Sequence, residues 1–287
     1  MSKMLPDAAS ARLPLPVNTF LKNARLRLRM LDAPKRALPH FIIIGAQRGG
    51  TTSLYAYLCQ HPDIHAAFVK EVGFFSQFFD RDMRWYRAHF PARKSLAGGA
   101  VSGESSPDYI YFPQCAARIA ETVPGVKLIA LLRNPADRAV SAHALETRRG
   151  VEELPLAEAI YREETRLASE RAKMESNPIY WSETWRRFSY KQRGLYAEQI
   201  ERYLRHFHRD ELLVLRSEDL FADPAATVKR VFDFVGVDSG FAPPDLRPRN
   251  AAPRPVDSDD AVRDYLTEYF KPHNARLEAL LNMKFDW

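Results

Sequence analysis

Short apolar runs alternate along the chain with longer stretches in which apolar side chains recur at helical spacing. Five of these runs predict β-strands, near His40–Gly45, Ile64–Ala67, Ala100–Gly103, Val126–Leu132 and Glu211–Leu215. Strands that alternate with helices are typical of a mainly parallel sheet that helices cover on both faces. The pattern therefore predicts an α/β fold, a three-layer sandwich with a central sheet of about five strands.

The same pattern divides the chain into a basic N-terminal arm with a leader helix, residues 1–39, and a single domain, residues 40–287. Within the domain, the charged stretch Glu152–Lys173 leads into an aromatic run that contains Trp181. This part is either an ordinary helix and loop or a mobile lid whose rings supply flat surfaces for a sugar. A late helix is expected over Asp259–Tyr269.

A glycine-rich turn joins the first predicted strand to a helix whose first turn carries hydroxyl groups, in FIIIGAQRGGTTSLYAY. Such a turn directs backbone N–H groups and the positive end of a helix dipole at one point, which favours a phosphate. Gly45, Gly50 and Thr52 match the loop G-x-x-x-x-G-K-[ST], which makes the fold P-loop-like. Thr51 replaces the lysine and Arg48 is the only cation of the loop, so a nucleoside triphosphatase is disfavoured.

A second cation marks another predicted strand end. The run Val126–Leu132 is followed by Arg133, at a place where a magnesium-dependent enzyme of this kind is expected to carry an aspartate. Cys59 and Cys115 lack the spacing of a paired motif, and the eight histidines form no ligand pattern. We therefore expect a metal-free site for two separate anionic groups.

The formal charge of +6 lies in the N-terminal arm. Residues 1–40 hold eight Lys or Arg against Asp7 and Asp32, so the rest of the chain is neutral. A neutral body lacks the broad basic face of nucleic-acid binders, so no nucleic-acid partner is expected. Residues 22–36 form a solvated leader helix or a partly disordered tail, which we favour, or an amphipathic helix in peripheral contact with an anionic membrane.

No stretch of the sequence approaches the ~20 apolar residues of a membrane span. The charges near the N-terminus follow a weakly apolar stretch that prolines interrupt, which is the reverse of a signal peptide. The sequence therefore predicts a cytoplasmic protein.

An ordered series of segments carries a family resemblance: GAQRGGTTSL, HPDI, KEVGFF, GESSPDY, RNPADRAVSAH, RGLYAEQIERYLRHF and EDLFADP. In this order they resemble the sulfotransferases that use 3′-phosphoadenosine 5′-phosphosulfate (PAPS), particularly the carbohydrate branch. The resemblance runs from about Phe41 to Val237. It implies a soluble enzyme that transfers the sulfuryl group of PAPS, without a metal, to a hydroxyl, less readily an amine, of a carbohydrate, glycolipid or small-molecule acceptor.

Sulfuryl transfer needs a cradle for the leaving 5′-phosphate, on which negative charge builds. The turn can supply this cradle, and its expected donor-binding residues are Arg48, Gly49, Gly50, Thr51, Thr52 and Ser53. Arg133 and Ser141 can reach one 3′-phosphate from a strand end and the following helix, as the matching residues do in the family. Arg249 lies in the proline-rich segment Arg247–Pro255, which is either a loop that closes over the cofactor, as in related enzymes, or a linker.

Glu71 in KEVGFF is the expected general base. A carboxylate flanked by Val72 and the phenylalanine pair can be partly desolvated, which would raise its pKa. The carbohydrate sulfotransferases place a catalytic glutamate at this point of the motif. Arg48 is the other expected catalytic residue, because its charge would stabilise the departing phosphate. The alternative is that Glu71 only pairs with Lys70 or Arg48.

Contacts with the acceptor are assigned to Lys70, Glu104 and Trp181, although Glu104 alternatively anchors a local turn. Gly73 and Ser105 stand where several heparan-type relatives carry histidine and lysine, so heparan sulfate itself is not implied as the substrate. Two other classes remain open at this point. One is a kinase-like phosphate-loop transferase, and the other is a nucleotide-binding or membrane-associated protein that has lost catalysis.

Overall fold

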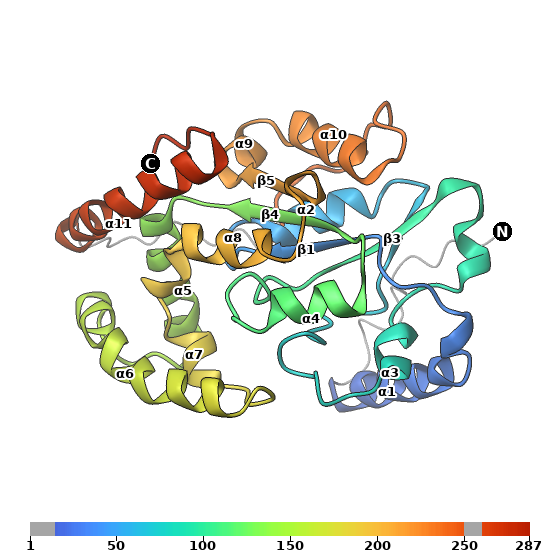
Figure 1. Ribbon diagram of the computed structural model, residues 1–287, viewed down its shortest axis with the longest axis horizontal. Coiled ribbons are helices and arrows are strands. Elements are labelled where there is room, and N and C mark those ends of the chain that lie inside the picture. Colours follow the sequence, from blue (N-terminus) through green and yellow to red (C-terminus); the bar gives the residue numbers. More distant parts are fainter. Residues whose placement is uncertain (1–14, 250–259) are drawn as a thin grey trace.

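The computed structural model describes residues 15–249 and 260–287. Its centre is a five-stranded sheet in the order β2-β3-β1-β4-β5, and every neighbouring pair of strands is parallel (Figure 1). The strands are β1 (Phe41–Gly45), β2 (Ile64–Ala66), β3 (Val101–Ser105), β4 (Lys127–Leu132) and β5 (Leu212–Arg216). The predicted α/β fold and the positions of its five strands are confirmed.

Helices surround the sheet (Figure 1). They are α1 (Leu15–Leu31), α2 (Thr51–Leu58), α3 (Met83–Ala88), α4 (Cys115–Thr122), α5 (Pro135–Arg148), α6 (Leu156–Ser176), α7 (Glu183–Arg187), α8 (Tyr196–Leu204), α9 (Ser217–Ala222), α10 (Pro224–Val235) and α11 (Asp260–Leu281). Short 3-10 turns are η2 (Ala33–Lys35), η3 (Arg93–Gly99), η4 (Gln192–Gly194) and η5 (Arg209–Glu211). Within the described ranges, no helix combines the length and apolar character that spanning a bilayer requires.

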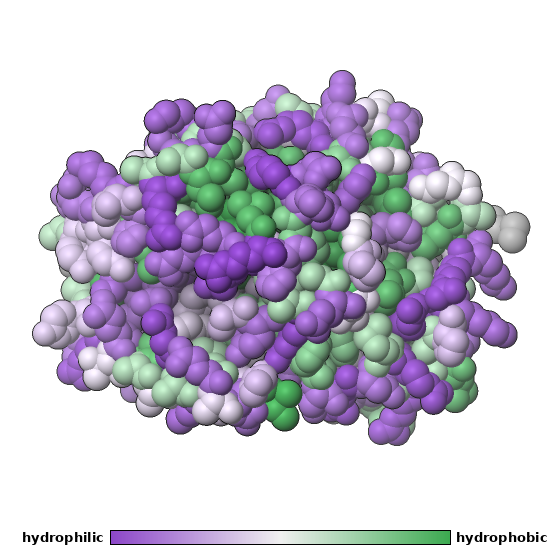
Figure 2. Space-filling view, in the orientation of Figure 1, coloured by the Kyte–Doolittle hydropathy of each residue, from purple (hydrophilic) through white to green (hydrophobic). Residues whose placement is uncertain are grey.

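Alternate residues of the central strands serve opposite layers. Ile42 and Leu128 belong to an apolar cluster with side chains of α4 and α8, whereas Ile43 and Ile129 belong to a cluster with α2 and α10. This follows because successive side chains of a strand point to opposite faces. A third cluster joins α5, α6 and α11. Hydrophilic side chains cover most of the face shown in Figure 2, as expected when the apolar ones fill the layers.

Strand β3 extends beyond its predicted end at Gly103. Glu104 pairs in register with Ile42 of β1, Ser105 pairs with Ile43, and all five residues of β3 are buried. Their polar side chains concealed this extension in the sequence pattern, because a buried strand normally reads as a continuous apolar run.

The last helix is also longer than predicted. α11 passes its predicted end at Tyr269 and continues through Pro272. Phe270 and Leu277 are both buried, so the apolar side of the helix continues across the proline and packs on the domain. Its predicted first residue, Asp259, lies outside the described residues.

The strand order places β1 between β3 and β4, so the loops that follow these three strands meet at one edge of the sheet. The contact between β1 and β4 continues into the following turn, where the Ala46 N–H donates to the Leu131 carbonyl oxygen at 2.8 Å. Ligands of parallel α/β sheets bind outside the carboxyl ends of the strands, so a ligand site is expected at this edge.

Candidate active site

Close backbone contacts shape the turn between β1 and α2. A Cβ at Gly49 would lie 2.5 Å from the carbonyl oxygen of Leu131, so no larger residue fits there. Gly50 has φ +93°, in the region that favours glycine, and Arg48 adopts φ 69°. α2 starts at Thr51 without a side-chain cap. Its first N–H groups therefore remain available to an anion, as the sequence predicts.

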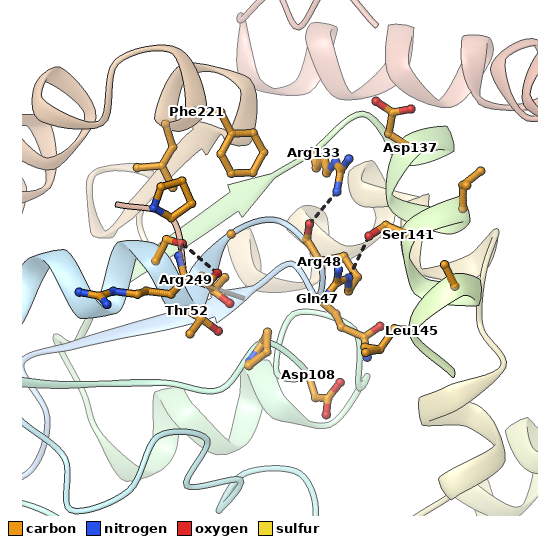
Figure 3. Close-up of a pocket in the computed structure, with 18 of the residues that line it drawn as sticks. Gln47, Arg48, Thr52, Asp108, Arg133, Asp137, Ser141, Leu145, Phe221 and Arg249 are labelled. Carbon is orange, nitrogen blue, oxygen red and sulfur yellow. Dashed lines mark hydrogen bonds between the residues drawn. The ribbon is translucent and has the colours of Figure 1, made fainter. Parts of the chain in front are cut away.

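A cavity of about 1090 Å³ opens at this edge, between the turn, α5 and α9 (Figure 3). Its lining includes most of the predicted site residues, namely Arg48, Gly50, Thr51, Thr52, Ser53, Glu71, Arg133, Ser141 and Arg249. Four predicted residues do not line it: Gly49, Lys70, Glu104 and Trp181. The fold thus brings together residues from distant parts of the sequence.

Arg48 connects the turn to both residues predicted to bind the 3′-phosphate. Arg133 Nη1 donates to the Arg48 carbonyl oxygen at 3.3 Å, and Arg48 Nε donates to Ser141 Oγ at 3.0 Å (Figure 3). Burial, and then the neighbouring charge of Arg133, lower the pKa of Arg48. The positive charges of Arg48 and Arg133 thus repel one another, and an anion bound between them would offset that repulsion.

Guanidinium groups outnumber carboxylates around the cavity. The arginines of the described lining are Arg48, Arg133, Arg148, Arg149, Arg186, Arg249 and Arg263, and its acids are Glu71, Asp108 and Asp137. Seven positive minus three negative charges leave a formal excess of four. Some of these groups are already paired, namely Asp137 with Arg263, Asp108 with Arg186 and Arg193, Arg149 with Glu146, and Arg249 with Asp245. The lining therefore favours an anionic ligand.

Glu71 lies on the rim of the cavity in a turn with φ +61°. Its N–H donates to the Ser105 carbonyl oxygen at 3.0 Å, and its Oε1 accepts from Lys70 Nζ at 2.6 Å. The expected desolvation by Val72 and the phenylalanine pair is wrong, because these side chains pack into the core while the Glu71 side chain stays 48% exposed. The alternative pairing with Lys70 is present.

Glu104 is fully buried and does not reach the cavity. Its carboxylate accepts from Tyr86 Oη at 2.7 Å, Ser106 Oγ at 2.8 Å and, more weakly, Tyr109 Oη at 3.3 Å. Burial raises the pKa of Glu104 to about 7, although these hydrogen bonds act in the opposite direction. Ser106 Oγ also accepts from the Gly73 N–H at 3.2 Å. Direct contact of Glu104 with the acceptor is therefore not supported, and its carboxylate anchors the turn that carries the candidate base.

A second cavity of about 60 Å³ adjoins the first. It is lined by Glu71, Gly73, Ser76, Gln77, Ser106, Pro107, Asp108, Trp181 and Arg186. The Trp181 ring stacks on Phe112 with centroids 4.6 Å apart, and its Nε1 donates to Glu183 at 2.9 Å. Most of the preceding charged stretch lies in α6, and the aromatic run leads into α7. Glu71 belongs to both cavities.

Arg249 is docked on α2 through its backbone. Its N–H donates to Ser53 Oγ at 2.8 Å, and the same hydroxyl donates to its carbonyl oxygen at 3.2 Å (Figure 3). Its guanidinium pairs with Asp245 at 2.6 Å. The predicted basic loop therefore begins at the cavity, while its continuation over residues 250–255 lies outside the described residues.

The sequence pattern assigns no role to Phe221 and Arg186, yet both line the main cavity. Phe221 is 52% exposed, and its ring comes within 3.1 Å of a Cβ built at Gly50. Its segment, EDLFADP, belongs to the family resemblance, but spacing along the chain does not show that this ring faces the turn. Arg186 pairs with Asp108 at 3.1 Å, a contact between segments far apart in sequence.

The family model described as "Sulfotransferase domain" matches residues 38–246, which is more than half of the chain and includes both sides of the cavity. The chain therefore belongs to the sulfotransferase family and is a PAPS-dependent sulfotransferase. This assignment replaces the kinase-like alternative.

The chain is similar to several curated proteins and to a solved structure. The chain is 29% identical to heparan sulfate glucosamine 3-O-sulfotransferase 6 of Mus musculus, over 98% of this chain and 85% of the mouse protein. It is 31% identical to bifunctional heparan sulfate N-deacetylase/N-sulfotransferase 3 of Homo sapiens, over 85% of this chain and 30% of the human protein. Among solved structures, a sulfotransferase from Alicyclobacillus acidocaldarius is 31% identical, with a TM-score of 0.71, over 87% of this chain and 98% of that one.

Proposed function

We propose that the main cavity holds PAPS with its 5′-phosphosulfate on the turn Arg48–Ser53 and its 3′-phosphate between Arg133 and Ser141. The observation that carries this proposal is the pair of contacts that Arg48 makes, one to each of those two residues. They bring two cationic groups, a hydroxyl and a helix N-terminus to one cavity. Charge-assisted hydrogen bonds to phosphate are the contacts that such groups form.

The purine is proposed to lie against Phe221. This ring is exposed at the wall of the cavity, beside Gly50, and the neighbouring Leu220 and Pro248 also line that wall. An aromatic ring with an open face offers a stacking surface for a flat heterocycle. Arg249 also lines the cavity, although its guanidinium is paired with Asp245.

Glu71 is proposed to act as the base. The acceptor hydroxyl oxygen attacks sulfur, the bond between sulfur and the 5′-phosphate oxygen breaks, and the hydroxyl proton passes to the Glu71 carboxylate. The membership of Glu71 in both cavities supports this role, because the base must face the donor on one side and the acceptor on the other. Lys70 fixes Oε1 of the carboxylate. Arg48 and the first N–H groups of α2 stabilise the leaving phosphate.

The acceptor is proposed to be a hydroxyl of a sugar, glycolipid or small metabolite that enters beside Trp181. Similarity to a 3-O-sulfotransferase supports a hydroxyl, and similarity to a protein with an N-sulfotransferase part makes an amine the second candidate. Gly73, the position at which the family resemblance implies a histidine in several heparan-type relatives, lies in the wall of the smaller cavity. We therefore do not expect heparan sulfate itself to be the acceptor.

A transfer assay with labelled PAPS tests this function. The purified chain is incubated with labelled PAPS and one acceptor at a time. The acceptors are a neutral oligosaccharide, a glycolipid, a phenol and an oligosaccharide that has free amino groups. We expect label on a hydroxyl-bearing acceptor in the presence of a metal chelator. Label on none of these acceptors, while the nucleotide still binds, would support the alternative that catalysis has been lost.

A further inference from the structure

Helix α1 is a fixed part of the surface. It lies beside α3 (Figure 1), and Arg29 donates to the carbonyl oxygens of Ala88 and Phe90 at 2.5 and 2.8 Å. Arg36, just beyond the helix, also donates to the Phe90 carbonyl oxygen, at 2.9 Å. These contacts hold one side of α1 on the domain, so its opposite side faces outward in a defined orientation.

The outward side is apolar. Phe20, Leu28 and Leu31 are 71%, 66% and 73% exposed, and Leu21 is 38% exposed. At about 100° per residue these four side chains fall in one sector about 100° wide. Leu26 and Met30, which are only half-buried, fall on the opposite side of the helix, toward the domain. The domain thus covers one apolar side of α1 and leaves the other uncovered.

Cations border this exposed apolar sector. On the same helical projection Arg25 and Arg27 lie at its two edges, and both are exposed. Helix α1 contains no acidic residue. The first acid after it, Asp32, is already paired with Arg36 at 2.6 Å. The exposed side therefore has an apolar centre and a positive border that no acid of the helix neutralises.

We propose that α1 binds an anionic membrane surface. Its apolar sector would enter the boundary between headgroups and acyl chains, while Arg25 and Arg27 would contact anionic headgroups, the arrangement of interfacial amphipathic helices. This surface lies outside the catalytic cavity and its role is independent of the proposed reaction.

Charge favours the membrane over protein occupants of the same surface. A second copy in a twofold arrangement would bring the cations of α1 against the same cations of its partner. Residues 1–14 carry Lys3 and Arg12 against Asp7, so they offer no excess of negative charge either. An anionic lipid surface supplies both the apolar layer and the negative charge.

Vesicle flotation with the full chain tests the proposal. The wild-type chain is expected to float with vesicles of phosphatidylglycerol and phosphatidylcholine at low salt, and far less with phosphatidylcholine alone. The triple variant Phe20→Ser, Leu28→Ser, Leu31→Ser should bind at least about tenfold more weakly, because the buried apolar area sets interfacial affinity. The variant Arg25→Glu, Arg27→Glu should lose about tenfold or more, since each cation near an anionic surface contributes about 1 kcal/mol.

Two matched controls change equally exposed residues elsewhere. Tyr161→Ser removes an apolar side chain that is 85% exposed on α6, and Lys229→Glu with Arg230→Glu reverses two exposed charges on α10. Both controls should float like the wild-type chain. All variants should keep the wild-type thermal midpoint and its shift with 3′-phosphoadenosine 5′-phosphate (PAP), which separates loss of membrane binding from unfolding or loss of nucleotide binding.

Three results would overturn the proposal. The first is a wild-type chain that floats with neither vesicle, and the second is an α1 variant that binds as tightly as the controls. The third is a concentration-dependent dimer of the wild-type chain that the triple serine variant abolishes, without any vesicle binding. That last result would assign the apolar sector to a second copy of the chain.

Discussion

Ser141 Oγ accepts a hydrogen bond of 3.0 Å from Arg48 Nε, across 93 residues of sequence. The contact joins the turn between β1 and α2 to α5 and gives the Arg48 guanidinium a neutral acceptor. A phosphate oxygen is a stronger acceptor for a guanidinium than a hydroxyl is. Nucleotide binding should therefore exchange this contact for charged ones, and the two residues should contribute differently to affinity and to rate.

Replacing Arg48 should affect chemistry more than binding. Arg48→Ala is expected to lower kcat by about 10²–10³, the usual effect of removing a group that stabilises developing negative charge. Ser141→Ala should weaken donor binding by about tenfold, with kcat nearly unchanged, because a 3′-phosphate contact is made equally in the ground and transition states. Steady-state kinetics with varied PAPS separate the two, and equal effects on kcat would refute this division of roles.

Removing the base should leave the nucleotide site intact. Glu71→Gln is expected to lower kcat by at least about 10², while the thermal shift with PAP stays at the wild-type value. Glu175→Gln changes an exposed glutamate at the end of α6 and serves as the control. Wild-type turnover in the Glu71 variant would remove this residue from the role of base.

Replacing Trp181 should affect binding of the acceptor and not binding of the nucleotide. Trp181→Ala should raise the KM for the acceptor about fivefold, equivalent to the ~1 kcal/mol of an aromatic contact, and leave the affinity for PAP unchanged. The ring also stacks on Phe112, so the thermal midpoint of the variant should be recorded alongside. An unchanged acceptor KM would show that the smaller cavity does not receive the acceptor.

Glu104 should make stability depend on pH. Its folded-state pKa of about 7 lies above its usual value of 4.5, so the folded protein keeps a proton that the unfolded chain releases. The free energy of unfolding should therefore fall as pH rises from about 4.5 to about 7, by about 3 kcal/mol from this group. Glu104→Gln should remove that contribution.

Urea unfolding of wild type and Glu104→Gln at several pH values measures this effect. The difference between the two proteins is the relevant quantity, because other groups titrate in the same range. Burial lowers the pKa of His89 to about 4, for example, which makes stability rise with pH between about 4 and about 6.5. If the free energies of unfolding of the two proteins changed with pH in parallel, this result would contradict the raised pKa of Glu104.

The sheet and the glycine-rich turn between β1 and α2 could be predicted from the sequence, because apolar runs, glycine positions and motif order report local geometry directly. The sequence did not show whether each carboxylate is exposed or buried. Glu71 precedes an apolar motif yet stays half exposed, and Glu104 lies at the end of a strand yet is buried among the hydroxyls of Tyr86 and Tyr109. Burial of a polar group depends on partners from other segments, and spacing along the chain does not reveal them.

The cavity wall shows the same limit of local patterns. Phe221 was part of a recognised segment, but only the packing of α9 beside the turn places its ring near Gly50. The length of α11 likewise depended on burial of residues such as Leu277, which outweighs the presence of Pro272 within the helix. In both cases tertiary contacts decided the outcome.

A calorimetric comparison of PAP with adenosine 5′-phosphate, in the presence of a metal chelator, tests most directly whether Arg133 and the turn hold one nucleotide. The wild-type chain and the control Arg230→Ala should prefer PAP by about 10–100-fold, the effect of charged hydrogen bonds to the 3′-phosphate. Arg133→Ala should lose most of this preference while binding adenosine 5′-phosphate as before. An undiminished preference for PAP in Arg133→Ala would contradict the account.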